Sequence, residues 1–312
     1  MTIEEALHDL GVAPFEAFVG EPHEIRGDEA FYTIKGGYLL LIVPYRPIQV
    51  EENGVAFCDT YYPAHQRAYH TKLEIKKALT ELCLYCTDFK GEYKPLFARL
   101  GVGKIAKNTL LLLPAVGSFC AIEVLVIEKD AKEPTGAITL CEECASCDRC
   151  VRLCPMKALE GGSFIRERCI RDLQFYPLSQ ETDAEKRKTL RNKVMGCNIC
   201  QISCPQNLRL RKEIDGPDQD YRKWFDLDVL ALGCIMPGKE REFYADYFGK
   251  NFMRPRRVLS HVLNAMENDR ANIKRHYGFM KEYEGRVTDN AVRSLINDYL
   301  ARWEKEYALN AP

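Results

Sequence analysis

The chain has 312 residues and a formal net charge of −1 at pH 7, and 46% of its residues are apolar. This length suggests two or three domains with a substantial core, and the balanced charge excludes a uniformly basic surface for nucleic acids. No apolar run reaches the ~18 residues of a membrane span, and the chain begins with the pattern of an acidic amphipathic helix rather than a signal peptide. We therefore expect a cytoplasmic protein with no membrane contact.

The first domain is expected to span residues 1–135, where helical and strand-like patterns alternate. Two stretches have the apolar spacing of helices and three have the length of buried strands: Met1–Leu10 and 69–85 for the helices, and 38–45, 109–113 and 121–128 for the strands. Helices between apolar strands predict an α/β layer. The segment 131–138 contains proline and glycine and is predicted to link this domain to the next one.

A dense group of cysteines follows this link. Cys144, Cys147, Cys150 and Cys154 form the pattern C-x2-C-x2-C-x3-C, and Pro155 comes directly after it. In bacterial ferredoxins the first three thiolates of this pattern bind one 4Fe-4S cluster and the fourth binds the other cluster. Two residues between cysteines let the chain curl around one face of a cluster, and the proline turns the chain away after the last ligand.

A fourth ligand of this kind predicts a second motif, which "GCNICQISCPQN" (196–207) supplies. By pseudo-symmetry its last cysteine returns to the first cluster, and Cys169, between the two motifs, is the natural candidate for the remaining ligand. The sequence thus predicts two 4Fe-4S clusters. Their predicted ligands are Cys144, Cys147, Cys150 and Cys204 for cluster 1, and Cys154, Cys169, Cys197 and Cys200 for cluster 2.

Zinc is the main alternative, because paired C-x2-C motifs also form zinc ribbons. Four closely spaced cysteines and a second group that ends in Cys-Pro fit zinc poorly, however, and a disulfide framework is typical of small secreted domains. The other six cysteines are predicted to be small buried apolar residues: Cys58, Cys83, Cys86, Cys120, Cys141 and Cys234. Cys141 shares the two-residue spacing, but a motif that began there would lose its Cys-Pro ending.

The cysteine region, 136–210, is predicted to be a ferredoxin-like domain, and 211–312 is predicted to be mainly helical, with helices at 254–268 and 289–307. Two groups of basic residues are either anion-binding patches or ordinary solvated helix faces. They are Lys186, Arg187, Lys188, Arg191 and Lys193 in the first group, and Lys250, Arg254, Arg256 and Arg257 in the second.

The order of these motifs resembles that of the epoxyqueuosine reductases, the cobalamin-dependent iron–sulfur enzymes of tRNA queuosine synthesis, which are related to the reductive dehalogenases. "MGCNICQISCPQN" (195–207) is very similar to the family's second ligand group. Other similar stretches are "YLLLIVPYRP" (38–47), "AHQRAYHTKL" (64–73), "ARLGVGKIAKNTLLL" (98–112), "GSFCAIEVLVI" (117–127) and "FGKNFMRPRRVLSHVLNAMEN" (248–268). The resemblance is dense in the cysteine region and patchy elsewhere.

The resemblance implies an α+β or α/β protein with an N-terminal cobalamin-binding α/β domain, a central ferredoxin-like domain with two 4Fe-4S clusters and a short helical C-terminal region. In the family no side chain ligates the cobalt, a cluster beside the corrin reduces it to Co(I), and an aspartic acid supplies a proton. The chain contains no D-x-H-x-x-G segment, which would offer a histidine to cobalt. The residues that the resemblance assigns to the corrinoid are Gly101, Gly103, Lys107, Asn108, Thr109, Gly117 and Ser118.

The chain departs from the family's G-x-G-Trp-x-Gly-K-N-T segment at two positions, where Lys104 replaces the tryptophan and Ala106 the third glycine. These changes put the corrin pocket in doubt. The family's proton donor falls near Asp88 after a one-residue shift, and a plain loop carboxylate is the alternative. A general acid must lie within hydrogen-bond reach of the reacting atom, which the sequence does not show.

Tyr62, Tyr69 and Tyr93 are alternative proton donors, although ordinary packing is the simpler expectation for each. His65 and His70 are expected to be helix-surface or capping residues rather than metal ligands. We therefore expect an iron–sulfur reductase that passes electrons to a corrinoid, with an electron donor such as ferredoxin or flavodoxin and with tRNA as a candidate partner. A second hypothesis is a cobalamin-free electron-transfer protein that docks a partner. A third is a zinc-stabilised nucleic-acid-binding module.

Overall fold

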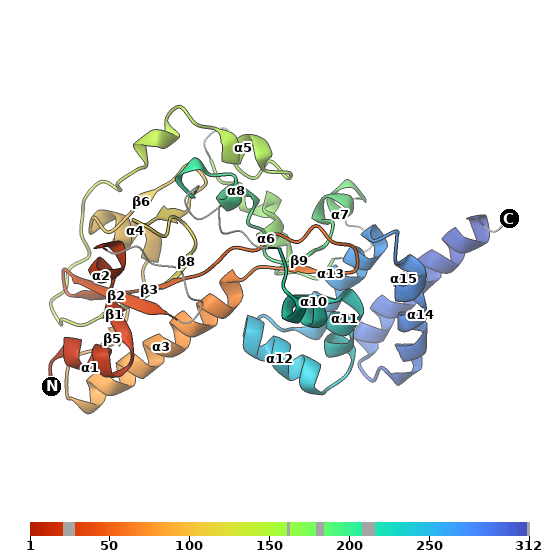
Figure 1. The fold of residues 1–312 in the computed structure, drawn as a ribbon, viewed down its shortest axis with the longest axis horizontal. Helices are drawn as coiled ribbons and strands as arrows, with labels where there is room; N and C mark the ends of the chain where they lie inside the picture. Colours follow the sequence, from red (N-terminus) through yellow and green to blue (C-terminus); the bar gives the residue numbers. More distant parts are fainter. Residues whose placement is uncertain (21–28, 161–162, 179–183, 208–215, 311–312) are drawn as a thin grey trace.

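The computed structural model describes residues 1–20, 29–160, 163–178, 184–207 and 216–310 (Figure 1). Its main sheet has five strands in the order β1 (Val12–Pro14), β2 (Ala30–Lys35), β3 (Tyr38–Pro44), β8 (Cys120–Val126) and β5 (Thr87–Asp88). The pairing of β1 with β2 is parallel, and the other three pairings are antiparallel. The expected layer of helices and strands is therefore present, but its connections are mostly those of an α+β protein.

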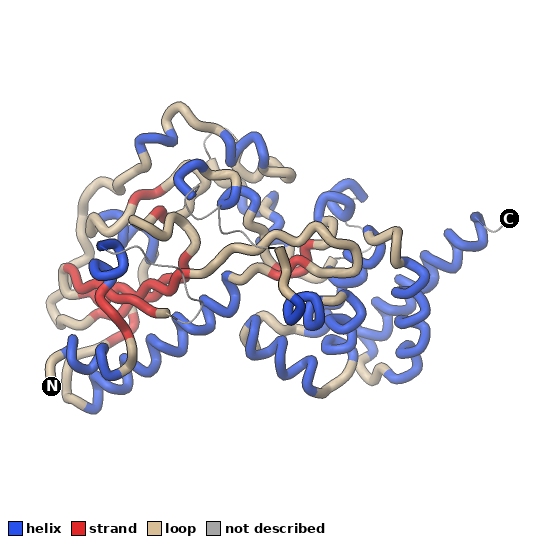
Figure 2. Tube along the Cα trace, in the orientation of Figure 1, coloured by secondary structure: helices blue, strands red, loops and turns tan. Residues whose placement is uncertain are grey.

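Helices cover both faces of this sheet (Figure 2). Helices α1 (Ile3–Asp9) and α3 (Tyr61–Glu81) pack on one face, and α2 (Phe15–Gly20) and α4 (Tyr93–Arg99) pack on the other. All seven residues of β3 are buried, because a strand between two layers of helices has no side exposed to water. This explains why β3 is one continuous apolar run in the sequence.

Most predicted elements are confirmed. The predicted strands at 38–45 and 121–128 correspond to β3 and β8, and the predicted helices at the N-terminus, 254–268 and 289–307 correspond to α1, α13 (Pro255–Asn268) and α15 (Asn290–Asn310). The helix predicted at 69–85 is the second part of α3. In the described part of the chain, no helix combines the length and the apolar character needed to cross a bilayer.

The remaining elements are short in the cysteine region and helical after it. In the cysteine region they are η1 (Glu142–Cys144), α5 (Arg149–Leu153), η2 (Arg166–Arg168), α6 (Ile170–Leu173), α7 (Ala184–Leu190), β9 (Lys193–Met195), α8 (Ile199–Ile202) and η3 (Pro205–Asn207). The later ones are α10 (Gln219–Phe225), α11 (Leu227–Ile235), α12 (Lys239–Phe248), α14 (Ile273–Tyr283) and η4 (Glu284–Arg286). Strands β4 (Phe57–Cys58), β6 (Lys104–Ile105) and β7 (Leu111–Leu112) precede the cysteines.

A stretch from the first region crosses into the helical region. Strand β4 pairs in parallel with β9, so Phe57 lies opposite Lys193. Side chains from Ile48 to Tyr62 share one apolar core with β9 and with the C-terminal helices. The predicted boundaries at 135 and 210 therefore describe the order of motifs along the chain, whereas the side-chain packing joins all three regions.

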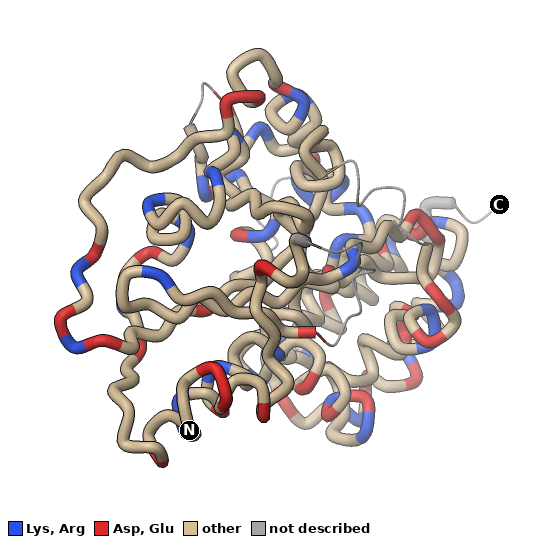
Figure 3. The backbone as a smooth tube through the Cα atoms, turned by 60° about the vertical axis from the view of Figure 1, so that its left-hand side comes forward, with Lys and Arg blue, Asp and Glu red and all other residues tan. Residues whose placement is uncertain are grey.

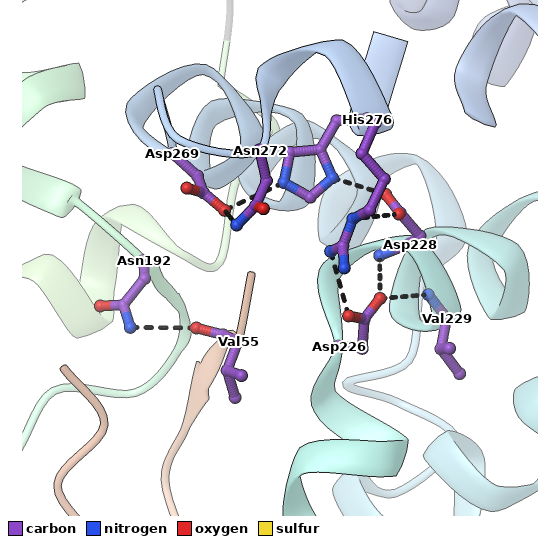
Figure 4. Close-up of polar contacts among 9 residues, drawn as sticks. Val55, Asn192, Asp226, Asp228, Val229, Asp269, Asn272 and His276 are labelled. Atoms are coloured by element: carbon purple, nitrogen blue, oxygen red, sulfur yellow. Dashed lines mark hydrogen bonds and ion pairs between the residues drawn. The ribbon is translucent and has the colours of Figure 1, made fainter. Parts of the chain in front are cut away.

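A buried polar network fixes the loop before β4 (Figure 4). His276 is fully buried, with Nδ1 2.6 Å from Asp228 Oδ1 and Nε2 3.1 Å from Asp269 Oδ2. Arg275 pairs with Asp228 and with Asp226 at 3.0 Å each. Each ring nitrogen of His276 thus has a carboxylate oxygen within hydrogen-bond distance, and Asp228 is shared between His276 and Arg275.

Replacing His276 by alanine should lower the free energy of unfolding by about 1–3 kcal/mol, because it removes the buried hydrogen-bond partner of Asp228 and Asp269. Urea unfolding measures this change. The matched control is His70→Ala at an exposed position of α3, which should change stability by less than about 0.5 kcal/mol. Equal effects of the two substitutions would contradict the role given to the network.

Candidate functional site

The four predicted ligands of cluster 1 line a single cavity of about 150 Å³: Cys144, Cys147, Cys150 and Cys204. They come together because α5, which carries Cys150, packs against α8, which ends just before Cys204. Within the described residues, no three His, Cys, Asp or Glu side chains are placed to hold a single metal ion. A ring of four thiols around a cavity suits a cluster of several atoms better than one zinc ion.

The predicted ligands of cluster 2 also lie close together. Burial raises the pKa of Cys200, and so do four neighbouring thiols: Cys197, Cys169, Cys150 and Cys154. Such mutual effects require short distances, and the influence of Cys150 shows that the two sets of cysteines adjoin. A bound cluster reverses the effect of burial, because a thiol that coordinates a metal is deprotonated. All fourteen cysteines are free thiols in the structure.

The turn between β6 and β7 lies against both sets of cysteines. The backbone N–H of Lys107 points at Cys144 Sγ at 3.5 Å, and its ammonium donates to the carbonyl oxygen of Cys147 at 2.6 Å. The side-chain amide of Asn108 donates to the carbonyl oxygen of Cys200 at 3.1 Å. Lys107 and Asn108, which the resemblance assigns to a corrinoid, thus use their polar groups to hold the cysteine segments.

A second contact, the Asn207 contact, joins the start of β8 to the end of the second motif. The backbone N–H of Ser118 donates to Asn207 Oδ1 at 3.0 Å, and the Asn207 amide donates to Ser118 Oγ at 2.9 Å. The Gln201 amide donates to the carbonyl oxygen of Ser118 at 2.9 Å. Gly117 has a φ of +57°, and a Cβ atom there would lie 2.0 Å from Asn207 Oδ1. Only glycine leaves room for this contact.

The other residues assigned to the corrinoid lie nearby but differ in environment. Gly101 is exposed with a φ of +71°, whereas a Cβ atom at Gly103 would lie 2.7 Å from the carbonyl oxygen of Leu112. The carbonyl oxygen of Thr109 accepts a hydrogen bond from the Lys94 ammonium at 3.2 Å. These residues shape the β6–β7 hairpin.

A polar group at one edge of the sheet joins Tyr93, one of the alternative proton donors, to Lys72 and Glu123, which no motif in the sequence marks. Strand β5 pairs only with Leu125 and Val126, so among the described strands the first half of β8 has no neighbour on that side. There the buried Lys72 ammonium lies 2.6 Å from Glu123 Oε2, and the Tyr93 hydroxyl donates to the same oxygen at 3.2 Å. Burial, and then the Glu123 charge, raise the pKa of Tyr93 to about 12. The hydroxyl therefore keeps its proton at neutral pH.

Asp88 stands at the outer side of this group. Its carboxylate accepts a hydrogen bond from Lys76 and lies 3.9 Å from the Lys72 ammonium. The hydrogen bond from Lys76 holds the pKa of Asp88 below its ordinary value. Asp88 is thus a half-exposed, ionised carboxylate here, so in this arrangement it has no proton to donate.

Lys94 connects this edge to the cysteines. Burial and the nearby Arg171 lower the pKa of Lys94, whereas the Cys200 and Cys120 thiols raise it. The Arg171 guanidinium lies 4.1 Å from the centre of the Tyr61 ring. The edge of β8 and the predicted ligands of cluster 2 are therefore neighbours.

The remaining candidates are ordinary surface or packing residues. Tyr62 is buried and packs edge-on against Phe248 and Phe252, while Tyr69 and His70 are exposed on α3. His65 is half-buried, and burial lowers its pKa. These positions fit the simpler expectation that they pack or cap rather than bind metal.

The six remaining cysteines follow the prediction only in part. Cys58, Cys141 and Cys234 are buried, and Cys86 and Cys120 are half-buried. Cys83 is exposed, so its predicted burial is wrong. The reason is local, because Cys83 has a φ of +57° in the turn that ends α3 and points away from the core.

Acidic and basic residues are interspersed along the described chain (Figure 3). In the first basic group Arg187 pairs with Glu267 at 3.8 Å and Lys188 with Glu185 at 3.7 Å. In the second group Arg257 is buried and donates to a backbone carbonyl, whereas Arg254 and Arg256 are exposed. Neither group forms one uniform patch.

Comparisons with known proteins agree with the geometry. A family profile described as a 4Fe-4S double cluster binding domain matches residues 143–207. Epoxyqueuosine reductase from Lactococcus garvieae is 38% identical over 215 residues, which cover 67% of this chain and 56% of that protein. The protein of the same name from Listeria monocytogenes is 32% identical over 151 residues, which cover 45% of this chain and 38% of that protein. The chain is a homologue of the epoxyqueuosine reductases.

Solved structures of epoxyqueuosine reductases share the fold. The structure from Streptococcus thermophilus has a TM-score of 0.56 and 18% identity, covering 86% of this chain and 82% of that one. An epoxyqueuosine reductase structure with an epoxyqueuosine-modified tRNA stem loop has a TM-score of 0.57 and 15% identity, covering 85% and 81%. The sequence alignments span about half the length of the epoxyqueuosine reductases or less. The prediction of a double 4Fe-4S region is thus confirmed for residues 143–207.

Gly117→Ala should weaken the Asn207 contact, because the new methyl group would overlap Asn207 Oδ1. We expect less iron bound per chain and a lower unfolding temperature, measured by iron analysis and by thermal unfolding. Gly136→Ala is the control, since a Cβ atom there meets nothing within 4 Å. Unchanged iron content in Gly117→Ala would contradict the role of the contact.

Proposed function

We propose that the protein is an iron–sulfur reductase of the epoxyqueuosine reductase type. The observation that carries this proposal is the cavity lined by Cys144, Cys147, Cys150 and Cys204, with a second set of thiols beside it. Eight thiolates from two interleaved motifs are the donor set of two 4Fe-4S clusters. Cluster 2 would be held by Cys154, Cys169, Cys197 and Cys200. The clusters would carry single electrons toward the edge of β8, where Lys94 lies near the Cys200 thiol.

The proton would be supplied at the same edge. Tyr93 holds a proton and contacts Glu123, which Lys72 fixes in place. Asp88 is the donor that the family resemblance suggests, but its bond with Lys76 favours the ionised form. We therefore propose Tyr93 as the proton donor, with Lys72 and Glu123 as positioning residues.

Cobalamin is the cofactor that the resemblance implies. Three of the residues assigned to it, Lys107, Asn108 and Ser118, make hydrogen bonds with the cysteine segments, which disfavours them as direct contacts of a corrinoid. A cobalamin titration followed by absorbance distinguishes this reductase from the cobalamin-free electron-transfer protein, the second candidate that the altered hairpin supports.

The proposed substrate is epoxyqueuosine in tRNA, because one structural neighbour is an epoxyqueuosine reductase with a modified tRNA stem loop. A small one-electron carrier such as ferredoxin or flavodoxin is the proposed donor. The exposed Arg254 and Arg256 at the start of α13 are available for phosphate groups. Electrostatic binding of this kind weakens steeply with salt.

Anaerobic reconstitution should give about eight iron and eight sulfide per chain. Cys204→Ala should lose about half of the iron, because Cys204 lines the cavity of cluster 1. Cys83→Ser, at an exposed position outside both sets, should bind as much iron as the unchanged protein. Zinc in place of iron, or equal iron loss in both variants, would reject the cluster assignment.

Tyr93→Phe should lower the turnover of an epoxyqueuosine-containing stem loop by about 10²-fold, the usual contribution of a general acid. The iron content should stay unchanged, since Tyr93 does not line the cysteine cavity. Asp88→Asn serves as the comparison and should cost less than about tenfold. The reverse order of the two effects would assign the proton to Asp88.

A further inference from the structure

Lys107 contacts two of the four cysteines around the cavity of cluster 1. Its backbone N–H points at Cys144 Sγ at 3.5 Å, and its ammonium donates to the Cys147 carbonyl oxygen at 2.6 Å. Lys107 itself lines the cavity. The side chain is held in place at both ends, so its charge has a fixed position beside the thiols.

The charge of Lys107 is not neutralised by an acidic neighbour. In the described part of the chain no carboxylate oxygen lies within 4.0 Å of its ammonium, whereas other lysines such as Lys72 and Lys76 have such partners. Glu143 also lines the cavity, but its carboxylate accepts from the Cys141 thiol at 3.2 Å. The lining of the cavity therefore holds one cation and one carboxylate, Lys107 and Glu143, and the Lys107 ammonium is fixed on the Cys147 carbonyl oxygen rather than on that carboxylate.

A fixed cation beside an iron–sulfur cluster changes its reduction potential. Net charge, hydrogen bonds to sulfur and solvent exposure set the potential of such clusters. The reduced cluster carries one more negative charge than the oxidised cluster, so a nearby cation stabilises the reduced form more. An N–H group directed at a ligating sulfur acts in the same sense.

We propose that Lys107 is a positioning residue that raises the reduction potential of cluster 1 and so sets how an electron is shared between the two clusters. This inference rests on the proposed function, because it requires the four thiols to hold a 4Fe-4S cluster. It assigns Lys107 to electron transfer rather than to binding of a corrinoid. The hydrogen bonds of Lys107 go to the segment of cluster 1, whereas the basic neighbours of the cluster 2 cysteines are Lys94 and Lys193. The potential of cluster 2 should therefore change little.

The test is a potentiometric titration of the reconstituted full-length protein, followed by electron paramagnetic resonance. In Lys107→Met one of the two midpoint potentials should move to a more negative value, and the other should stay. Lys107→Arg keeps the charge and should have the same two midpoint potentials as the wild-type protein. Lys77→Met is the control, because Lys77 is an exposed lysine of α3 that does not line the cavity, and it should move neither potential.

Two unchanged potentials in Lys107→Met, or equal movement of both, would overturn the inference. If Lys107→Met loses iron, Lys107→Gln removes the charge while keeping a hydrogen-bond donor, and unchanged potentials in that variant overturn the inference as well. Failure of the unchanged protein to bind iron and sulfide would instead reject the proposed function. Iron and sulfide analysis of every sample separates the two failures.

Discussion

Hydrogen bonds from buried amides hold the second cysteine motif against the start of β8 and the β6–β7 hairpin, and the rest of the site depends on them. Asn207, Gln201 and Asn108 each donate to a backbone or hydroxyl oxygen on the facing segment. Amides can satisfy donors and acceptors together without burying a charge. Thiols that line a cavity for a cluster cannot pack against one another. Their positions therefore depend on the hydrogen bonds that hold the surrounding backbone.

The same frame leads to the edge of β8, where the proposed function needs both an electron and a proton. Strand β8 begins directly after the Asn207 contact and runs past Lys72, Glu123 and Tyr93. The segment from Ser118 to Glu123 therefore contacts the second cysteine motif through Ser118 and the Lys72–Tyr93 group through Glu123. The buried Lys72–Glu123 pair costs desolvation free energy, and such pairs in a protein interior are candidates for functional sites.

The sequence predicts most of the elements and the cysteine sets because each is encoded locally. Apolar periodicity marks β3, β8 and α13, and cysteine spacing marks the cluster ligands. The polar group at the edge of β8 has no such local pattern, since Lys72 and Glu123 meet only when α3 packs on the sheet. The family resemblance singled out Lys107 and Ser118 but not their hydrogen-bond partners in the cysteine segments, because a sequence motif identifies residues and not their contacts. Cys83 differs from its prediction because a helix-ending turn, not composition, sets its exposure.

The pairing of β4 with β9 joins positions that are far apart in the sequence, Phe57 and Lys193. During synthesis the earlier strand leaves the ribosome long before its partner, and the core that covers both includes α13. Native contacts of such long separation form late. The second cysteine motif directly follows β9, which packs on α13. Its thiols would therefore reach their final arrangement only after α13 has been made, so a complete pair of clusters would form after that point in synthesis.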